Sequence, residues 1–439
     1  MPASLADSLQ RLYARTAHGI KLGLEVETNL LQRMGNPHLR MPHVHVAGTN
    51  GKGSVCAMLE SVLRSAGYRT GLYTSPHLVR FNERIRVAGQ CISDEELGGL
   101  FDEVEQLDRE LAAAPGGRQA TFFEFTTALA FEHFRRQKAE LAVLETGLGG
   151  RLDATNVVMP LVSVITRIDI EHTQYLGKTL TEIAAEKAGI IKPGRTVICG
   201  SMPDEARDVI KRTAADRRAT LILVEDAVSV RRVSQDLHGQ KVKIDTPAQS
   251  YGTVVLPLPG KYQMENVALA VAAAQYVNDA SPFVVRDDAV KKGLKSVRWP
   301  ARCQVLSEDP LVILDVAHNP NGARALAESL RELAKGKELG LIVGLLSDKD
   351  CRGFMTPFAS LVKKCWAVQI QNERTMPMDQ LLACTRSVGL EAAGSPLSQA
   401  LAEAKEWGRG ANRAVCIAGS LFLAGEVLQA EGLGDKLYS

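Results

Sequence analysis

The chain has 439 residues, of which 45% are hydrophobic and 23% are charged, and its formal net charge at pH 7 is +2. This balance is typical of a folded globular protein large enough for two domains, and it excludes a disordered chain. Basic and acidic residues are interspersed throughout and aromatic residues make up only 5%, so neither a nucleic-acid-binding nor a membrane-binding surface is indicated.

Nothing at the N-terminus resembles a secretory signal, and no apolar run approaches the roughly 20 residues that cross a bilayer. The eight cysteines include no Cys-x-x-Cys pair and lie mostly in apolar surroundings, which favours buried thiols over metal ligands. We therefore expect a cytoplasmic protein with reduced cysteines.

The first third of the chain predicts a strand–helix–strand unit. Residues 5–35 are expected to be mainly helical, and residues 41–47 to form a strand that ends in a glycine-rich turn. A helix over 52–66, with Gly67 as its C-cap, then leads to a strand over 70–74. This order within about thirty residues indicates a parallel sheet.

The same alternation continues to about residue 200. Further helices and strands of this domain are predicted at 121–138, 141–144, 161–165, 179–191 and 196–199. From about 219 to 258 the alternating polar and apolar residues indicate antiparallel strands inserted at the edge of the domain. A helix over 264–278 is expected to close it.

After residue 298 the alternation restarts in a smaller unit, with elements predicted at 311–315, from 321, 339–345, 365–369, 397–408 and 414–417. We therefore expect an α/β protein with two domains. Residues 1–297 would form a P-loop ATPase-type domain with a mostly parallel sheet, and residues 298–439 a Rossmann-like α/β domain.

The turn after the first strand predicts a phosphate site. It consists of Gly48, Thr49, Asn50, Gly51, Lys52, Gly53 and Ser54. Backbone N–H groups of such a turn and the N-terminus of the following helix surround a polyphosphate, which Lys52 and the Ser54 hydroxyl also reach. The alternative is a glycine-rich turn with a surface lysine.

Three polar residues follow predicted strands of the same sheet: Ser75, Glu145 and His172. Because the carboxyl ends of parallel strands line one crevice, we expect these side chains to lie near the phosphate site. A carboxylate beside a phosphate loop commonly holds Mg²⁺. Each residue read singly has a structural alternative, such as a loop histidine.

The smaller domain offers polar groups in equivalent positions. Asp315 and His318 follow one predicted strand, and Ser420 follows another. With Arg302 in the linker, they indicate a nucleotide site between the domains. The alternative for Asp315 is a cap of the helix that follows.

Several motifs resemble the folylpolyglutamate synthase/dihydrofolate synthase family, within the Mur ligase superfamily. They are Gly48–Ser54, Tyr73-Thr-Ser-Pro-His-Leu78, Glu145-Thr-Gly-Leu-Gly-Gly-Arg-Leu-Asp-Ala-Thr-Asn156, Glu186-Lys-Ala-Gly-Ile-Ile-Lys192 and Leu314-Asp-Val-Ala-His-Asn-Pro-Asn-Gly322. They occur in the family's order and span about residues 20 to 425.

The resemblance implies an enzyme that converts a carboxylate to an acyl phosphate with ATP and then joins it to L-glutamate. ATP would lie between the domains, with Asn266, Arg302 and Asp315 around the part beyond the phosphates. Ser75, Glu145 and His172 would hold Mg²⁺, and a carbamate on Lys187 would help to hold a second Mg²⁺. Lys52, His172, Lys187 and His318 are the catalytic candidates.

The resemblance also implies the substrate contacts. His318 and Ser420 would lie near glutamate, and Thr121, Phe123 and Asp153 near the pterin-bearing acid. The segments 18–25 and 121–125 resemble members that accept dihydropteroate as well as reduced folates, so we expect both activities. The resemblance also implies a monomer.

Some alternatives stay open at this point. Lys187 could pair with a phosphate or with a carboxylate such as Glu186. The chain could be a Mur-type ligase for another carboxylate or a nucleotide-switch protein without ligase activity. A peptidoglycan Mur ligase is not expected, because only 47 residues precede Gly48 and a UDP-sugar domain needs more.

Overall fold

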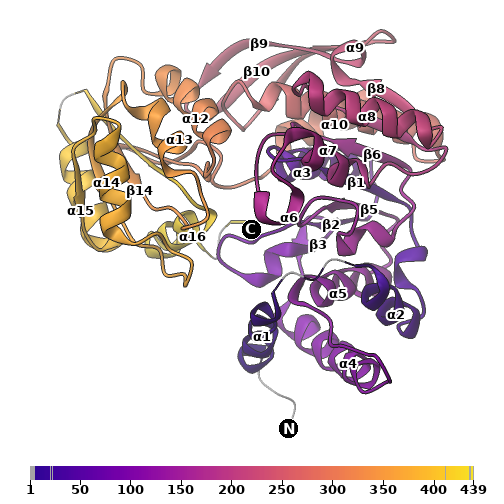
Figure 1. The fold of residues 1–439 in the computed structure, drawn as a ribbon. Helices are drawn as coiled ribbons and strands as arrows, with labels where there is room; N and C mark the ends of the chain where they lie inside the picture. Colours follow the sequence, from indigo (N-terminus) through magenta and orange to yellow (C-terminus); the bar gives the residue numbers. More distant parts are fainter. Residues whose placement is uncertain (1–4, 20, 22, 411, 435–436, 439) are drawn as a thin grey trace.

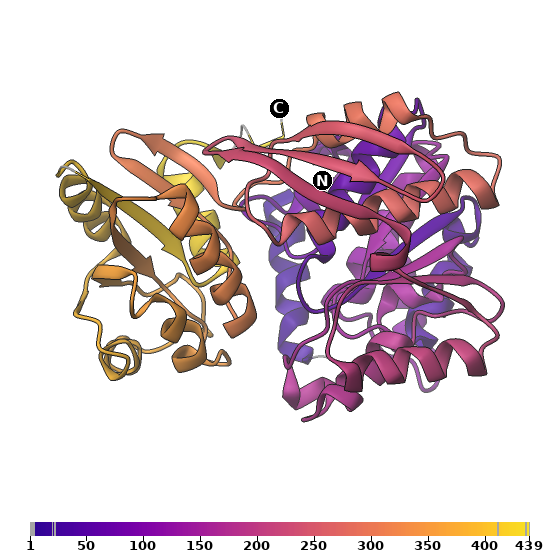
Figure 2. The same cartoon turned by 90° about the horizontal axis from the view of Figure 1, so that it is seen from above.

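A computed structural model describes residues 5–19, 21, 23–410, 412–434 and 437–438. The chain forms two α/β bodies side by side, the first in indigo to pink and the second in orange to yellow (Figures 1 and 2). The predicted fold class is confirmed. Ile20 and Leu22, within the segment 18–25, lie outside the described residues.

The first body is built on an eight-stranded sheet with the order β4-β3-β2-β5-β1-β6-β7-β8. Its strands are β1 (His43–Ala47), β2 (Thr70–Tyr73), β3 (Ile85–Val87), β4 (Gln90–Cys91), β5 (Leu141–Glu145), β6 (Val162–Ile165), β7 (Thr196–Cys199) and β8 (Thr220–Leu223). From β2 to β8 all neighbours are parallel, whereas β3 and β4 continue the sheet antiparallel. The central strand β1 is buried on both faces, as expected for a parallel sheet covered by helices.

Helices cover both faces of this sheet. They are α1 (Leu5–Ala14), α2 (Glu25–Arg33), α3 (Lys52–Ser65), α4 (Asp94–Ala112), α5 (Phe122–Arg136), α6 (Thr173–Leu176), α7 (Leu180–Ala188), α8 (Asp204–Asp216), α9 (Val224–Ala227), α10 (Gln263–Ala280) and α11 (Asp287–Ser296), with 3₁₀ turns η1 (Arg15–His18), η2 (Pro37–Leu39), η3 (Phe81–Arg84) and η4 (Ala154–Val157). One face packs against α3, α10 and α11, and the other against α2, α4 and α5 and, farther along the sheet, α7 and α8.

The predicted antiparallel insertion is present but shorter than expected. A three-stranded sheet is formed by β9 (Ser229–Asp236), β10 (Gly239–Asp245) and β11 (Ser250–Leu256). Residues 219–227 do not belong to it, because β8 pairs with β7 in parallel and extends the main sheet. Likewise α10 does not close the domain, since α11 follows and packs against α3.

The second body contains a six-stranded sheet with the order β12-β13-β17-β14-β15-β16. Its elements are β12 (Gln304–Glu308), β13 (Leu311–Leu314), α12 (Pro320–Leu333), β14 (Glu338–Val343), α13 (Cys351–Met355), η5 (Thr356–Phe358), β15 (Val362–Ala367), α14 (Met378–Ser387), β16 (Ala392–Gly394), α15 (Leu397–Gly408), β17 (Arg413–Ala418) and α16 (Leu421–Ala430). All pairs are parallel except β12 with β13.

The two bodies touch through contacts of different chemistry. The β9–β10 hairpin reaches across to α12, where Arg232 pairs with Glu332 at 2.7 Å in a partly exposed ion pair (Figure 2). The loop after β2 packs Leu78 and Val79 into the apolar cluster around α16. A Cβ at Gly425 of α16 would lie only 2.0 Å from the Leu78 carbonyl oxygen, so this contact is close.

The structure bears on the expected state of the cysteines and on membrane-spanning helices. Cys351 and Cys384 form a disulfide, so the expectation of reduced cysteines is wrong for this pair. The two cysteines are 33 residues apart and meet because α13 packs on α14, which sequence spacing does not reveal. Within the described ranges, no helix combines the length and apolar character needed to traverse a bilayer.

Candidate active site

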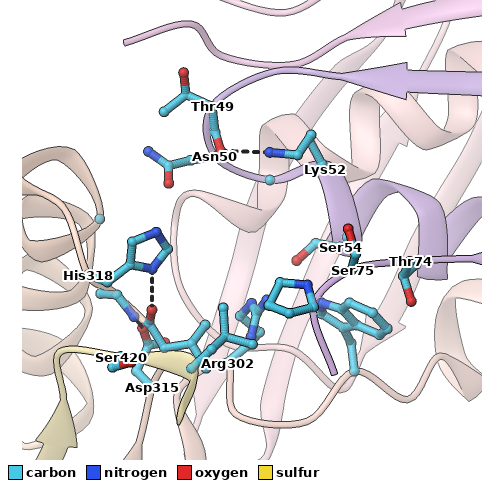
Figure 3. A pocket seen from close by; sticks show the side chains of 18 of the residues that line it. Thr49, Asn50, Lys52, Ser54, Thr74, Ser75, Arg302, Asp315, His318 and Ser420 are labelled. Carbon is cyan, nitrogen blue, oxygen red and sulfur yellow. Dashed lines mark hydrogen bonds between the residues drawn. The ribbon is translucent and has the colours of Figure 1, made fainter. Parts of the chain in front are cut away.

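A cavity of about 340 Å³ lies where the carboxyl ends of the two sheets face each other (Figure 3). Its lining includes fourteen of the predicted site residues: Thr49, Asn50, Gly51, Lys52, Gly53, Ser54, Ser75, Glu145, His172, Asn266, Arg302, Asp315, His318 and Ser420. The other five predicted residues, Gly48, Thr121, Phe123, Asp153 and Lys187, lie behind this lining. The predicted convergence of strand ends on one crevice is therefore observed.

The phosphate loop is shaped by glycines that no other residue could replace easily. Gly51 has φ +91° at the N-terminus of α3, a left-handed conformation that favours glycine. A Cβ at Gly53 would lie 2.5 Å from the ring of Trp299. The Lys52 ammonium group folds back over the loop and donates hydrogen bonds to the carbonyl oxygens of Gly48, at 2.9 Å, and Thr49, at 3.2 Å.

The loop is also tied to the second body. The side-chain amides of Asn50 and Asn319 pair reciprocally: the Asn319 Nδ2 donates to Asn50 Oδ1 at 3.0 Å, and the Asn50 Nδ2 to Asn319 Oδ1 at 3.4 Å. Asn319 is itself the N-cap of α12 and accepts from the N–H of Gly322. The phosphate loop and the start of α12 are thus held in register across the cavity.

The predicted metal ligands have a donor set suited to Mg²⁺. Glu145 ends β5, is 5% exposed, and accepts one hydrogen bond, from the N–H of Ser75 at 3.1 Å. Burial raises the pKa of Glu145, and the nearby Lys52 ammonium acts in the opposite direction. A buried carboxylate with free coordination capacity beside a hydroxyl and a phosphate loop fits a hard cation.

His172 lies at the N-terminus of α6 with φ +47°. Burial lowers the pKa of His172 to about 4, so the ring is neutral near pH 7 and keeps a lone pair. Within the described part of the chain, no three His, Cys, Asp or Glu side chains form a metal-holding group. A cation here would therefore rely on Ser75 and on phosphate and water oxygens as well.

Lys187 lies on α7 behind the phosphate loop and is 1% exposed. Its ammonium donates to the Gly48 carbonyl oxygen at 2.9 Å and to Glu171 Oε1 at 2.8 Å. Burial lowers the pKa of Lys187. For Glu171, burial acts to raise the pKa, but Lys187 and Lys52 outweigh it and bring the pKa to about 2. The carboxylate partner is thus Glu171 rather than Glu186, which pairs with Arg151.

On the opposite wall, Asp315 is buried and accepts hydrogen bonds from the N–H groups of Cys303 and Ala317, both at 2.8 Å. It does not cap α12, because Asn319 does. Burial raises the pKa of Asp315, against the attraction of Arg302.

His318 and Ser420 complete this wall. His318 Nδ1 donates to the Val316 carbonyl oxygen at 2.9 Å (Figure 3), and burial together with Lys349 lowers the pKa of His318 to about 4. The neutral ring therefore keeps its Nε2 lone pair. Ser420 is the N-cap of α16 and accepts from the N–H of Phe422.

Sequence reasoning missed six charged residues that line the cavity: Glu83, Arg167, Glu171, Glu265, Lys349 and Arg374. Lys349 lies in the loop after β14 and forms an ion pair with its neighbour Asp348, at 3.2 Å. Its position after a predicted strand is the same kind of signal that identified Ser75 and Glu145. Arg374 lies in the loop after β15 and follows the strand predicted at 365–369, so the same signal could have indicated it.

The residues predicted for the pterin-bearing acid have structural roles in the fold. Thr121 is the N-cap of α5, and Asp153 is the N-cap of η4. The Phe123 ring packs against Tyr73 with ring centroids 5.8 Å apart. A Cβ at Gly147, which lines the cavity, would lie 2.5 Å from the Phe123 ring, so these residues border the cavity from behind.

Comparisons with known proteins find matches for both bodies. Residues 46–274 match the Mur ligase middle domain, and residues 301–421 match the Mur ligase glutamate ligase domain. The chain is 34% identical to the dihydrofolate synthase/folylpolyglutamate synthase of Escherichia coli, over 99% of this chain and 97% of that protein. It is 37% identical to the Bacillus subtilis enzyme of the same name, over 82% of each.

Solved structures show the same arrangement of the chain. Mycobacterium tuberculosis folylpolyglutamate synthase, complexed with ADP and AMPPCP, superimposes with a TM-score of 0.90 at 29% identity, covering 98% of this chain and 99% of that one. Escherichia coli FolC in complex with DHPP and ADP superimposes with a TM-score of 0.85 at 33% identity, covering 98% and 97%.

Proposed function

The chain belongs to the folylpolyglutamate synthase/dihydrofolate synthase family of Mur ligases, and from this premise we propose the bond that it makes. It is an ATP-dependent ligase. Its amino-acid substrate is L-glutamate, and its acid substrates are dihydropteroate and reduced folates. The observation that carries this proposal is the cavity itself, which has a phosphate loop on one wall and the cationic side chains of Lys349 and Arg374 on the other.

The reaction starts from a carboxylate, which is a poor acyl donor until ATP converts it to an acyl phosphate. Lys52 lines the cavity, and a triphosphate would replace the two carbonyl groups to which it now donates. Its charge then lies where negative charge develops on the transferred phosphoryl group. Asn266, Arg302 and Asp315 would surround the rest of the nucleotide.

Ser75, Glu145 and His172 would hold Mg²⁺ between this loop and β5. The cation would supply charge neutralisation on the phosphate oxygens. Lys187 would help to hold a second Mg²⁺ as a carbamate, formed when its neutral amine adds to CO₂ and releases one proton. The burial that lowers its pKa makes that neutral amine accessible.

Glutamate would bind on the second wall. Lys349 and Arg374 supply positive charge for its two carboxylates, beside the His318 ring and the Ser420 hydroxyl. The His318 Nε2 lone pair can accept a proton from the attacking amine, because burial keeps that ring neutral. Closure of the two bodies around both substrates would protect the acyl phosphate from water.

An ADP-release assay tests the proposal. With purified protein, Mg²⁺ and ATP, we expect ADP release only when glutamate is present together with dihydropteroate or tetrahydrofolate. ADP release without glutamate would favour a nucleotide-switch protein, and release with neither acid but with another carboxylate would favour a different Mur-type ligase. Activity with tetrahydrofolate alone would exclude the bifunctional reading.

Three further expectations belong to the same proposal: the domain boundary, the oligomeric state and the location in the cell. We infer a division into domains at 297/298, which is supported by separate apolar clusters on either side of it. We also infer a monomer and a cytoplasmic location, which sedimentation and cell fractionation respectively would test.

A further inference from the structure

A buried arginine of the first body contacts the second body. Arg86 is on β3, where it pairs with Leu72 of β2, and it is 4% exposed. Among the residues that the structure describes, none forms a hydrogen bond with its buried Nε and Nη2 atoms. A buried charge is costly unless neighbouring groups stabilise it, so the other contacts of this guanidinium indicate its role.

Two aromatic rings lie against the Arg86 guanidinium. Its Cζ atom is 4.3 Å from the ring centroid of Tyr438 and 5.1 Å from that of Trp299. The face of an aromatic ring attracts a cation, and the attraction is stronger where water is excluded. Burial raises the pKa of Tyr438 to about 12, against the effect of Arg86, so its phenol is neutral near pH 7. The two rings therefore stabilise a charge that lacks hydrogen bonds.

The two rings come from the two segments that lead into and out of the second body. Trp299 lies in the connection from α11 to β12, and its ring covers the phosphate loop, since a Cβ at Gly53 would lie 2.5 Å from it. Tyr438 lies in the segment after α16. In the same segment, a Cβ at Gly434 would lie 3.1 Å from the Val79 side chain in the loop after β2. One guanidinium of the first body thus holds both segments.

Both rings also line the cavity of the proposed active site. Leu78 and Phe422 line it as well, and they belong with Tyr438 to the apolar cluster around α16. Tyr438 therefore helps to cover an apolar edge of the cavity at the junction of the two bodies. Loss of its ring would open this edge to water.

We propose that Arg86, Trp299 and Tyr438 form an interdomain clamp that keeps water from the acyl phosphate until glutamate attacks it. Arg86 is a positioning residue, because it acts through the two rings. The inference rests on the proposed function. Water that reaches the acyl phosphate would split it into the original carboxylate and hydrogen phosphate, with release of one proton. ATP would then be consumed without formation of an amide bond.

Tyr438→Ala tests the clamp through the amount of ADP released for each amide bond formed. Dihydropteroate, Mg²⁺, ATP and glutamate are supplied, and both products are measured in one reaction. We expect about one ADP per amide bond in the wild type and at least about threefold more in Tyr438→Ala. Tyr438→Phe keeps the ring and should keep the wild-type ratio. A wild-type ratio in Tyr438→Ala, or an equal rise in both variants, would overturn the proposal.

Arg86→Met should raise the ratio as much as Tyr438→Ala, because it removes the charge that holds the ring. The double variant should uncouple no further than either single variant, since all three lose the same interaction. If Arg86→Met does not fold, as judged by circular dichroism, the two Tyr438 variants decide alone.

Arg413→Met is the matched control. The Arg413 guanidinium lies 4.8 Å from the ring of Trp407 within the second body, and neither residue belongs to the lining of the cavity. We expect this variant to keep the wild-type ratio. An equal rise in Arg413→Met and Arg86→Met would assign the effect to general destabilisation and contradict the clamp.

The glutamate concentration gives an independent readout. Because glutamate and water compete for one acyl phosphate, the excess ADP of Tyr438→Ala should fall as glutamate is raised. An excess that does not respond to glutamate would mean that ATP is hydrolysed before the acyl phosphate forms, which contradicts the inference. Wild-type amide formation is measured in the same reactions. Its absence would refute the proposed function, whereas fully coupled variants beside an active wild type would refute the clamp alone.

Discussion

The two sides of the cavity differ in how their cations are held. On the side of the first body, Lys52 donates to two carbonyl oxygens of its own loop, and Lys187, behind it, donates to Gly48 of that loop and to Glu171. On the side of the second body, Lys349 contacts the adjacent Asp348, and Arg374 faces the cavity from a loop.

This difference predicts that substitutions on the two sides change different kinetic constants. Groups held in place before substrate arrives act on the charge that develops during reaction, so their loss lowers kcat. Groups that wait for an incoming ion contribute binding to ground state and transition state alike, so their loss raises KM. The following predictions test that division, in order of decreasing effect.

Lys52→Ala should lower kcat by about three orders of magnitude or more, because it removes a cation from the transferring phosphoryl group. The fold should persist, since the Lys52 side chain bonds only to its own loop. Steady-state ADP release and circular dichroism measure the two quantities. Lys211→Ala, at an exposed lysine of α8, is the control, and a folded Lys52→Ala variant with normal turnover would contradict the ATP site.

Lys187→Ala should lower kcat by about two orders of magnitude, with a smaller effect on KM for ATP. If a carbamate is the active form, short carboxylic acids added to this variant should restore part of the activity, because they supply the missing oxygen ligand. The same acids should leave Lys52→Ala unchanged. Full activity without added acid, together with electron density that ends at the Lys187 amine in a Mg²⁺–ATP complex, would refute the carbamate.

Lys349→Ala should raise KM for glutamate by about 10- to 100-fold, the usual cost of one hydrogen bond to a charged group. KM for ATP and kcat at saturating glutamate should change little, since the substitution is on the opposite wall. Initial rates at varied glutamate measure this. A fall in kcat with unchanged KM would assign Lys349 to the chemical step. It would contradict the proposed division of kcat and KM effects between the two sides of the cavity.

Arg232→Ala should have the smallest effect. The Arg232–Glu332 pair joins the hairpin to α12 at a partly exposed position, and such pairs contribute about 0 to 1 kcal/mol. Thermal unfolding and KM values should therefore stay close to wild type. A large rise in every KM would show that the hairpin sets the separation of the two walls.

Local sequence patterns identified the residues whose neighbours are close in the chain. The glycine turn before Lys52 and the carboxylate that ends β5 follow from strand, turn and helix signals, as does the parallel sheet. Pairings set by packing between elements gave no such signal. The Lys187–Glu171 pair and the Cys351–Cys384 disulfide depend on which elements lie against each other.

The predicted pterin contacts stay a prediction. Asp153 belongs to a recognisable motif, and each of its oxygens accepts a hydrogen bond from a backbone N–H of its own loop. A carboxylate has further lone pairs, so holding this turn does not decide whether Asp153 also contacts a ligand.

The apolar contact between the loop after β2 and α16 ties together segments near opposite ends of the chain. During synthesis the first body can fold around β1 and α3 long before α16 has been made, since N-terminal units generally fold first. The loop that carries Ser75 then lacks the surface on which Leu78 and Val79 pack. Until α16 has been made, hydrogen bonds to Glu83 and Glu145 within the first body are what holds this loop, and the apolar contact with α16 is added last.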